Sequence, residues 1–194
     1  LCRELGIAIP VGKDSLSMRT RWQSDGQEMT VFSPLSLIVT AFAPVSDVRK
    51  TLTPQLCTDQ PAELYLLDLG NGANRLGGSC LSQVFARAGG LPPDIDNPMQ
   101  IKALFDFLQA ANARGLLLAY HDRSDGGLFA ALCEMAFASR AGIDIDLATP
   151  AGPQLIGELF SEEPGVVVQV ANTEVAAFHD LLAKFGISTC ARKV

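Results

Sequence analysis

A polar stretch at residues 121–127 (HDRSDGG) holds the densest group of side chains suited to chemistry. It lies between an apolar run that predicts a buried strand and an apolar-periodic run that predicts a helix. A helix start attracts anions, and two glycines allow a ligand to come close to the backbone. Two carboxylates would repel a bare phosphate, but Asp122, Asp125 or both would bind Mg²⁺ that carries one. The loop therefore predicts a metal and a phosphate together.

The same loop also has a purely structural interpretation. Ser124 or Asp125 would cap the following helix, and Asp122 would be a solvated side chain in a turn. The spacing of these residues alone leaves both interpretations open.

A second candidate lies at residues 11–15 (VGKDS), in a predicted loop before a strand. Lys13 and the Ser15 hydroxyl are suited to binding a phosphate, Gly12 leaves room for it, and Asp14 adds another carboxylate that suits a metal. The stretch lacks the second glycine and the spacing of a Walker A sequence, so it is not a P-loop of that type.

Other polar groups carry weaker signals. Residues 76–79 (LGGS) form either a third anion seat or a tight turn in which Ser79 caps a helix. His179 lies on a predicted helix, and we expect a surface or packing role for it. A last acidic group predicts a solvated turn with capping, and paired-carboxylate acid/base chemistry stays open there: Glu158, Ser161, Glu162 and Glu163.

The elements that must position these groups change in character along the chain. Residues 1–47 predict a helical turn ending at Gly6, a hairpin and then a strand covered on both faces. Beyond an expected boundary near Asp47, strands and helices alternate, which favours a layered α/β or α+β domain. The hairpin is expected from residues 15–22 and 29–32, and the covered strand from 35–42. Further strands are expected at 63–69, 116–120, 143–147, 165–170 and 187–191, and helices from 80, at 97–111, 128–141 (capped by Gly142), 153–160 and 173–185.

Composition limits the class of protein. The chain has 194 residues, 48% hydrophobic and 19% charged, which is typical of a folded protein rather than a disordered one. A net charge of −6 with scattered basic residues argues against nucleic-acid binding, and no apolar run is long enough to span a membrane. The 5 cysteines are odd in number, widely spaced and without a CxxC pair, so we expect small buried side chains in a reducing compartment, the cytoplasm.

Three motifs in order resemble one enzyme family. Residues 10–18 (PVGKDSLSM), 121–128 (HDRSDGGL) and 159–165 (LFSEEPG) together look like phosphoribosylformylglycinamidine synthase of the long, single-chain kind. This family is the ATP-dependent, glutamine-using ligase of purine synthesis. Relatives in the aminoimidazole ribonucleotide synthetase superfamily would share the Asp-Gly-Gly loop but not the GKDSLSM run.

The resemblance implies an organisation and a set of ligands. Residues 1–47 would be the tail of a synthetase N-terminal α/β domain, and 48–194 the C-terminal α/β domain of the second synthetase half. Asp122 would be a Mg²⁺ ligand and Ser124 a contact to ATP or ADP. The other metal ligands would lie upstream, and a glutaminase domain with its nucleophilic cysteine would lie downstream in the same polypeptide, so the resemblance gives this chain's cysteines no role.

The implied reaction converts formylglycinamide ribonucleotide to formylglycinamidine ribonucleotide with ATP and ammonia from glutamine. The resemblance names no catalytic residue here, and we expect the chain by itself to lack synthase activity. Two alternatives stay open: a noncatalytic half that holds a nucleotide for structural reasons, and another ATP-using member of the superfamily.

Overall fold

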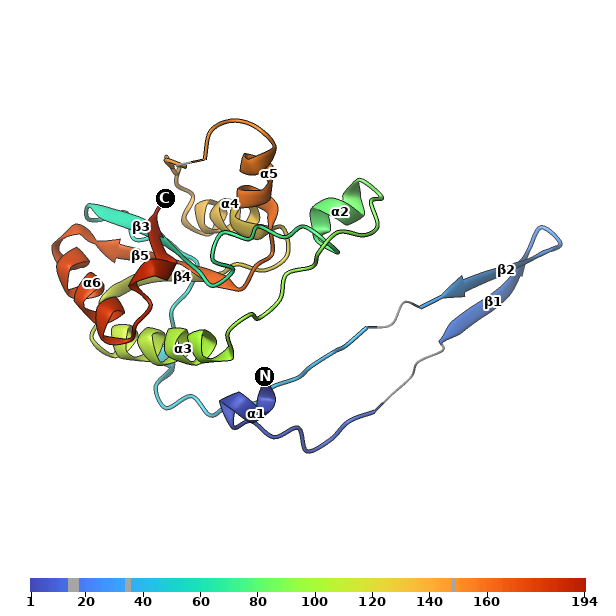
Figure 1. Ribbon diagram of the computed structural model, residues 1–194, viewed down its shortest axis with the longest axis horizontal. Helices are drawn as coiled ribbons and strands as arrows, with labels where there is room; N and C mark the ends of the chain where they lie inside the picture. Colours follow the sequence, from blue (N-terminus) through green and yellow to red (C-terminus); the bar gives the residue numbers. More distant parts are fainter. Residues whose placement is uncertain (14–17, 34–35, 148) are drawn as a thin grey trace.

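The computed structural model describes residues 1–13, 18–33, 36–147 and 149–194, and its main body is built on a four-stranded sheet (Figure 1). The strand order is β4-β5-β3-β6, and every neighbouring pair is antiparallel, with Tyr65 opposite Val168 at the centre. The strands are β3 (Ala62–Asp68), β4 (Leu117–Asp122), β5 (Gly165–Ala171) and β6 (Ala191–Lys193). The fold is mixed α/β. The 121–127 loop follows from the C-terminal end of β4, which therefore positions it.

Helices cover both faces of this sheet. Helices α3 (Pro98–Ala113) and α6 (Val175–Lys184) pack on one face, whereas α4 (Gly127–Ser139) packs on the other, with α5 (Pro153–Phe160) beside it. Strand β5 supplies both interfaces because alternate side chains of a strand point to opposite faces. Its Val168 joins the α3/α6 core and its Val167 joins the α4 core. The body therefore has three layers.

Aromatic side chains fill the core under α3 and α6. Phe107 and Phe178 are fully buried, and their rings meet edge to face with centroids 5.6 Å apart. The ring of Tyr65 packs against that of Phe178, with their centroids 4.9 Å apart. Burial of one such side chain stabilises the fold by about 1.5–3 kcal/mol. These contacts join β3 to both helices of that layer.

Local signals place several helix ends where the sequence predicts them. Asn97 caps α3 by accepting a hydrogen bond from the backbone N–H of Met99 at 3.0 Å, with Pro98 in the first turn. Ser79 caps the short helix α2 (Cys80–Val84) in the same way through Ser82. Helix α4, in contrast, ends at Ser139 and is capped by Arg140 in the left-handed conformation, so the predicted cap at Gly142 is wrong.

The N-terminal residues form a separate arm. The turn α1 (Cys2–Leu5) ends at Gly6, and the predicted hairpin is confirmed as β1 (Arg19–Ser24) and β2 (Gln27–Phe32). Asp25 and Gly26 both have positive φ, which matches the twist of a two-residue hairpin turn. Figure 1 shows the hairpin projecting away from the main body, and all of its residues are exposed.

Three strand predictions are wrong. Residues 36–42 form no strand, and Ile38 and Phe42 are 90% and 94% exposed, because no described strand pairs with them; Leu35 lies outside the described residues. Residues 143–147 also form no strand, although Ile143 and Ile145 pack against the α4 core, because alternation reports side-chain burial and not backbone pairing. At residues 187–191 the chain forms a 3₁₀ turn, η3 (Ser188–Cys190), and β6 begins only at Ala191.

The structure also bears on the expectations about membrane spans and cysteine burial. No helix among the described residues is long and apolar enough to cross a bilayer. All five cysteines are free, but only Cys190 is buried, so the expectation of buried small side chains is wrong for the other four, which are partly exposed. The domain boundary near Asp47, where the 3₁₀ turn η1 (Val48–Lys50) begins, stays a prediction.

Tyr65 gives the core a measurable titration. Burial raises the pKa of Tyr65 to about 12, assisted by the hydrogen bond that its hydroxyl donates to Glu63 at 2.7 Å. An unfolded tyrosine titrates near pH 10, so between about pH 10 and 12 the native state holds a proton that the unfolded state has lost. The free energy of unfolding should therefore fall as pH rises through that window. Spectrophotometric titration of tyrosinate should show a step near pH 12 that Tyr65→Phe removes. If the step that Tyr65→Phe removes lies near pH 10 instead, the prediction is wrong.

Candidate functional site

Arg123 anchors the 121–127 loop to the sheet. It follows the last residue of β4, and its side chain is 1% exposed. Its Nε donates to the backbone carbonyl of Glu163 at 2.6 Å, and its Nη2 donates to the carbonyl of Pro164 at 3.2 Å and to a carboxylate oxygen of Asp68. Its own N–H donates to the carbonyl of Gly165 at 2.8 Å. One guanidinium thus connects the ends of three strands.

The neighbours of Arg123 face the opposite way. Asp122 and Ser124 are both exposed, as expected when the residue between them is buried at a strand end. Within the described part of the chain, neither side chain has a hydrogen-bond or ion-pair partner. The loop therefore presents a carboxylate and a hydroxyl to solvent from a fixed backbone.

The capping interpretation of this loop is wrong. Helix α4 begins after Gly126, which has φ 81° and makes no side-chain capping bond. The turn is closed by the backbone instead, since Gly127 N–H donates to the carbonyl of Ser124 at 2.9 Å. Neither Ser124 nor Asp125 is needed to start the helix.

Gly127 is required by packing. A Cβ on it would lie 2.7 Å from the carbonyl oxygen of Ser161 and 2.8 Å from that of Leu159, and its φ is +69°. The space that a side chain would fill is thus occupied by the chain's own backbone at the end of α5. Close approach of a ligand, which the sequence suggested for this glycine, is not its role.

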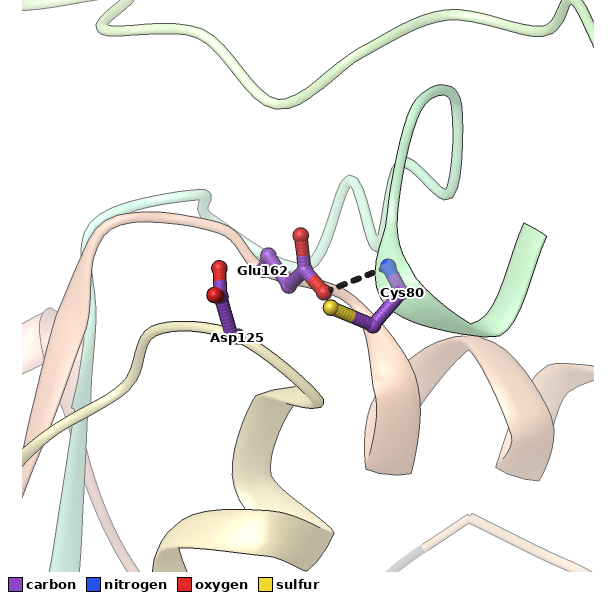
Figure 2. Close-up of side chains that lie close together, drawn as sticks. All are labelled: Cys80, Asp125 and Glu162. Atoms are coloured by element: carbon purple, nitrogen blue, oxygen red, sulfur yellow. Dashed lines mark hydrogen bonds between the residues drawn. The ribbon is translucent and has the colours of Figure 1, made fainter. Parts of the chain in front are cut away.

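Glu162 braces the loop from the other side. One of its carboxylate oxygens accepts a hydrogen bond from the N–H of Cys80 at 2.8 Å (Figure 2). The same oxygen accepts another from the N–H of Gly126 at 2.9 Å. These are the backbone groups that an external anion would use at the starts of α4 and α2. The suggested anion seat at residues 76–79 is therefore closed by an internal carboxylate, and Ser79 serves as a cap.

Asp125 lies beside this brace. One ligand atom from each of Cys80, Asp125 and Glu162 falls within 4.8 Å of the others, on three separate segments (Figure 2). Burial raises the pKa of the Cys80 thiol, and the nearby charges of Glu162 and Asp125 raise it further. The thiol is thus held protonated and is a poor nucleophile at neutral pH.

The acidic stretch at the end of α5 is not a solvated turn, which corrects the sequence-based expectation. Glu163 is fully buried, and Arg75 meets both of its oxygens, at 2.7 and 2.8 Å. Arg75 also bonds the Asp96 carboxylate at 3.1 Å. Glu158 is 5% exposed and forms an ion pair with Arg192. Ionised carboxylates are buried only when paired, and the distant arginines supply that pairing.

The histidines have structural surroundings. His121 lies at the end of β4, with Nε2 2.6 Å from a Glu134 oxygen and Nδ1 2.7 Å from the carbonyl of Asp122. His179 is exposed on α6 and contacts Tyr65 edge on, at 5.4 Å between ring centroids. The packing role predicted for His179 agrees with this contact.

The described part of the second sequence candidate, residues 11–13, is not brought to the loop. Gly12 and Lys13 are exposed in the segment after α1, which Figure 1 shows well apart from α4. Asp14 and Ser15 lie outside the described residues. The suggested phosphate and metal roles of these four residues stay predictions.

Two family matches cover most of the chain. Residues 63–193, more than half of it, match the AIR synthase related protein, C-terminal domain. The chain belongs to that family. Residues 1–44 match the FGAR-AT PurM N-like domain. The three layers around the antiparallel sheet are thus the AIR synthase-related C-terminal fold.

Solved structures are similar to this chain at low sequence identity. PurLQS from Thermotoga maritima is 10% identical over 76% of this chain, with a TM-score of 0.54. T. maritima PurL complexed with ATP is 13% identical over 86%, with a TM-score of 0.50. E. coli HypE, a hydrogenase maturation protein, is 18% identical over 74% of this chain and 45% of its own, with a TM-score of 0.49. The chain spans 23% of the length of each of the first two.

Sequence reasoning missed the roles of the buried Arg123 and the partly buried Arg75. In the sequence, Arg123 and Arg75 look like ordinary polar loop residues. Both bond to Glu163, which lies 40 residues from Arg123 and 88 residues from Arg75. A usable signal was present, since three acidic residues at 158, 162 and 163 flank an apolar helix face and need buried partners. Nothing local indicated which arginines would supply them.

The first prediction concerns Gly127. Gly127→Ala should lower the free energy of unfolding by at least about 2 kcal/mol, because it combines a left-handed φ with a backbone clash. Gly142→Ala is the matched control, since a Cβ there meets nothing within 4 Å. Urea denaturation of both variants measures the difference, and equal stabilities would refute the packing role.

A second prediction separates charge from hydrogen bonding at Glu162. Glu162→Ala leaves two backbone N–H groups without an acceptor, whereas the amide oxygen of Glu162→Gln can still accept from both. The alanine variant should therefore lose about 2–4 kcal/mol of stability and the glutamine variant distinctly less. Thermal unfolding compares them, and an alanine variant as stable as the glutamine one would show that these two hydrogen bonds contribute nothing to stability.

Proposed function

We propose that this chain is part of an ATP-dependent, glutamine-using ligase that converts formylglycinamide ribonucleotide to formylglycinamidine ribonucleotide. In this proposal Asp122 helps hold Mg²⁺ and Ser124 contacts the nucleotide. The wider activity belongs to a longer polypeptide, of which the rest, including a glutaminase domain, is the partner of this segment.

The observation that carries the proposal is that different residues of the 121–127 loop hold its backbone and face the solvent. Arg123, Gly127 and the brace from Glu162 hold its backbone, whereas Asp122 and Ser124 are exposed and, within the described residues, have no partner. A carboxylate and a hydroxyl on a rigid loop with no structural task are suited to binding a ligand.

The residues present fit Mg²⁺. This ion usually takes one or two protein carboxylates and completes its shell with water and substrate phosphates, so a single exposed Asp122 is a sufficient contribution from this chain. Asp125 is less suited to the same ion, because it lies in the group with Glu162 and Cys80. When bound, Mg²⁺ offsets the charge of the nucleotide phosphates.

The chain's own part in the reaction is positioning. Arg123 fixes the backbone on both sides of itself, so the backbone of Asp122 and Ser124 is already ordered and the entropic cost of binding is reduced. The Ser124 hydroxyl would donate to a phosphate oxygen, and Asp122 would remain ionised as a metal ligand. The fold shared with T. maritima PurL, determined with ATP, is consistent with this role.

The test uses the full-length polypeptide that contains these residues. Asp122→Asn should weaken Mg·ADP binding about 10–100-fold, because it removes a charged ligand, and Ser124→Ala about fivefold, because it removes one hydrogen bond. Asp180→Asn, an exposed carboxylate on α6, is the matched control. Isothermal titration calorimetry gives the affinities, and circular dichroism shows whether the variants fold.

Turnover measurements then divide the alternatives. Loss of formylglycinamidine ribonucleotide formation in Asp122→Asn, with folding intact, supports a catalytic nucleotide site. Normal turnover with a lowered melting temperature would instead assign a structural nucleotide. Unchanged Mg·ADP affinity in both variants would refute the proposed site, and a full-length protein inactive on formylglycinamide ribonucleotide would point to another member of the superfamily.

A further inference from the structure

Glu158 has a buried carboxylate that the protein satisfies only in part. The residue is 5% exposed, and its Oε1 forms an ion pair with Arg192. Its Oε2 is buried and has no hydrogen-bond partner among the described residues. An unsatisfied buried polar atom costs about 1–3 kcal/mol, and more when it is charged. The fold therefore keeps an acceptor whose donor must come from elsewhere.

Glu158 is one of the residues that line a cavity of about 440 Å³. The hollow lies where β3 ends at Asp68, between α5 and the start of β6, and Asn71, Asn74 and Arg123 also line it. Its volume is in the range of small-molecule sites. It is separate in composition from the proposed nucleotide contacts, since neither Asp122 nor Ser124 lines it.

The charges of the cavity favour an uncharged ligand. Two carboxylates, Asp68 and Glu158, face two guanidiniums, Arg123 and Arg192, so an anion or a cation would meet a like charge. Asp68 is already satisfied, because it accepts from Arg123 and from the N–H groups of Gly70 and Gly72. The pair left for a ligand is Glu158 and Arg192.

Glu158 and Arg192 present an acceptor and donors side by side. Oε2 of Glu158 needs an O–H or N–H, and the guanidinium of Arg192, a third exposed, has further N–H groups beyond the one used in the ion pair. Two adjacent hydroxyls meet both demands, because one donates to the carboxylate while the other accepts from the guanidinium. Asn71 and Asn74 offer additional amide partners around the hollow.

We infer that this cavity binds the vicinal diol of a neutral sugar ring, with Glu158 Oε2 as the hydroxyl acceptor and Arg192 as the donor. Carboxylates bind ribose hydroxyls in this manner in nucleotide-binding folds. The inference does not rest on the proposed ligase function, because it requires neither nucleotide nor turnover.

The test uses two neutral probes on the 194-residue chain. Methyl β-D-ribofuranoside should bind with millimolar affinity, observed by protein chemical-shift changes, and methyl 2-deoxy-β-D-ribofuranoside, which lacks one hydroxyl of the diol, should bind at least about tenfold more weakly. Because this comparison uses the unaltered protein, it does not depend on any variant folding.

Variants then locate the site. Glu158→Gln should weaken ribofuranoside binding at least about tenfold, whereas Asp59→Asn, an exposed carboxylate outside the cavity, should leave it unchanged. Absence of ribofuranoside binding, equal binding of the deoxy probe, or full affinity in a folded Glu158→Gln variant would each overturn the inference. Preferential binding of acetamide would assign a carboxamide ligand in place of a diol and would also overturn it.

Discussion

The buried guanidinium of Arg123 is the interaction on which the rest of the structure depends. It reaches the carboxylate at the end of β3 and two carbonyls before β5, from a position immediately after β4. A charge in this environment is stable only while all of its acceptors are in place. The register of three strands and the conformation of the adjoining loop are therefore coupled, and a shift of any one of these segments would leave the charge unpaired.

Two glycines and two carboxylates also restrict how the strand ends and the loop can be arranged. Gly165 opens β5 where a Cβ would lie 2.6 Å from the carbonyl of Leu67, and Gly127 opens α4 against the end of α5. Glu162 and Glu163, adjacent in sequence, reach opposite partners: the backbone N–H groups of two loops and the side chain of Arg75. The end of α5 thus organises the loop edge of the sheet, and the exposed side chains there owe their position to buried neighbours.

Sequence patterns predicted the parts of the fold that depend on local periodicity. Strands β3 and β5 and helices α3, α4 and α5 follow from apolar spacing, because each buries a face that its own residues define. Pairing partners are not local, so residues 36–42 and 143–147 have strand-like sequences but form no ladder. The loop at 121–127 was recognised from its side chains, whereas the roles of Arg123 and Glu162 depend on contacts that span 36 to 82 residues of sequence.

The β1–β2 ribbon has a consequence for how the chain behaves in solution. Both outer edges of this two-stranded sheet are open within the described residues, and its side chains are exposed. Open edges are templates for pairing with another chain, and a lone hairpin is only marginally stable in water. Charges such as the Arg21–Glu28 pair oppose such pairing at the surface of the ribbon. Among the described residues, the arm therefore offers strand edges on which another segment or another chain could pair.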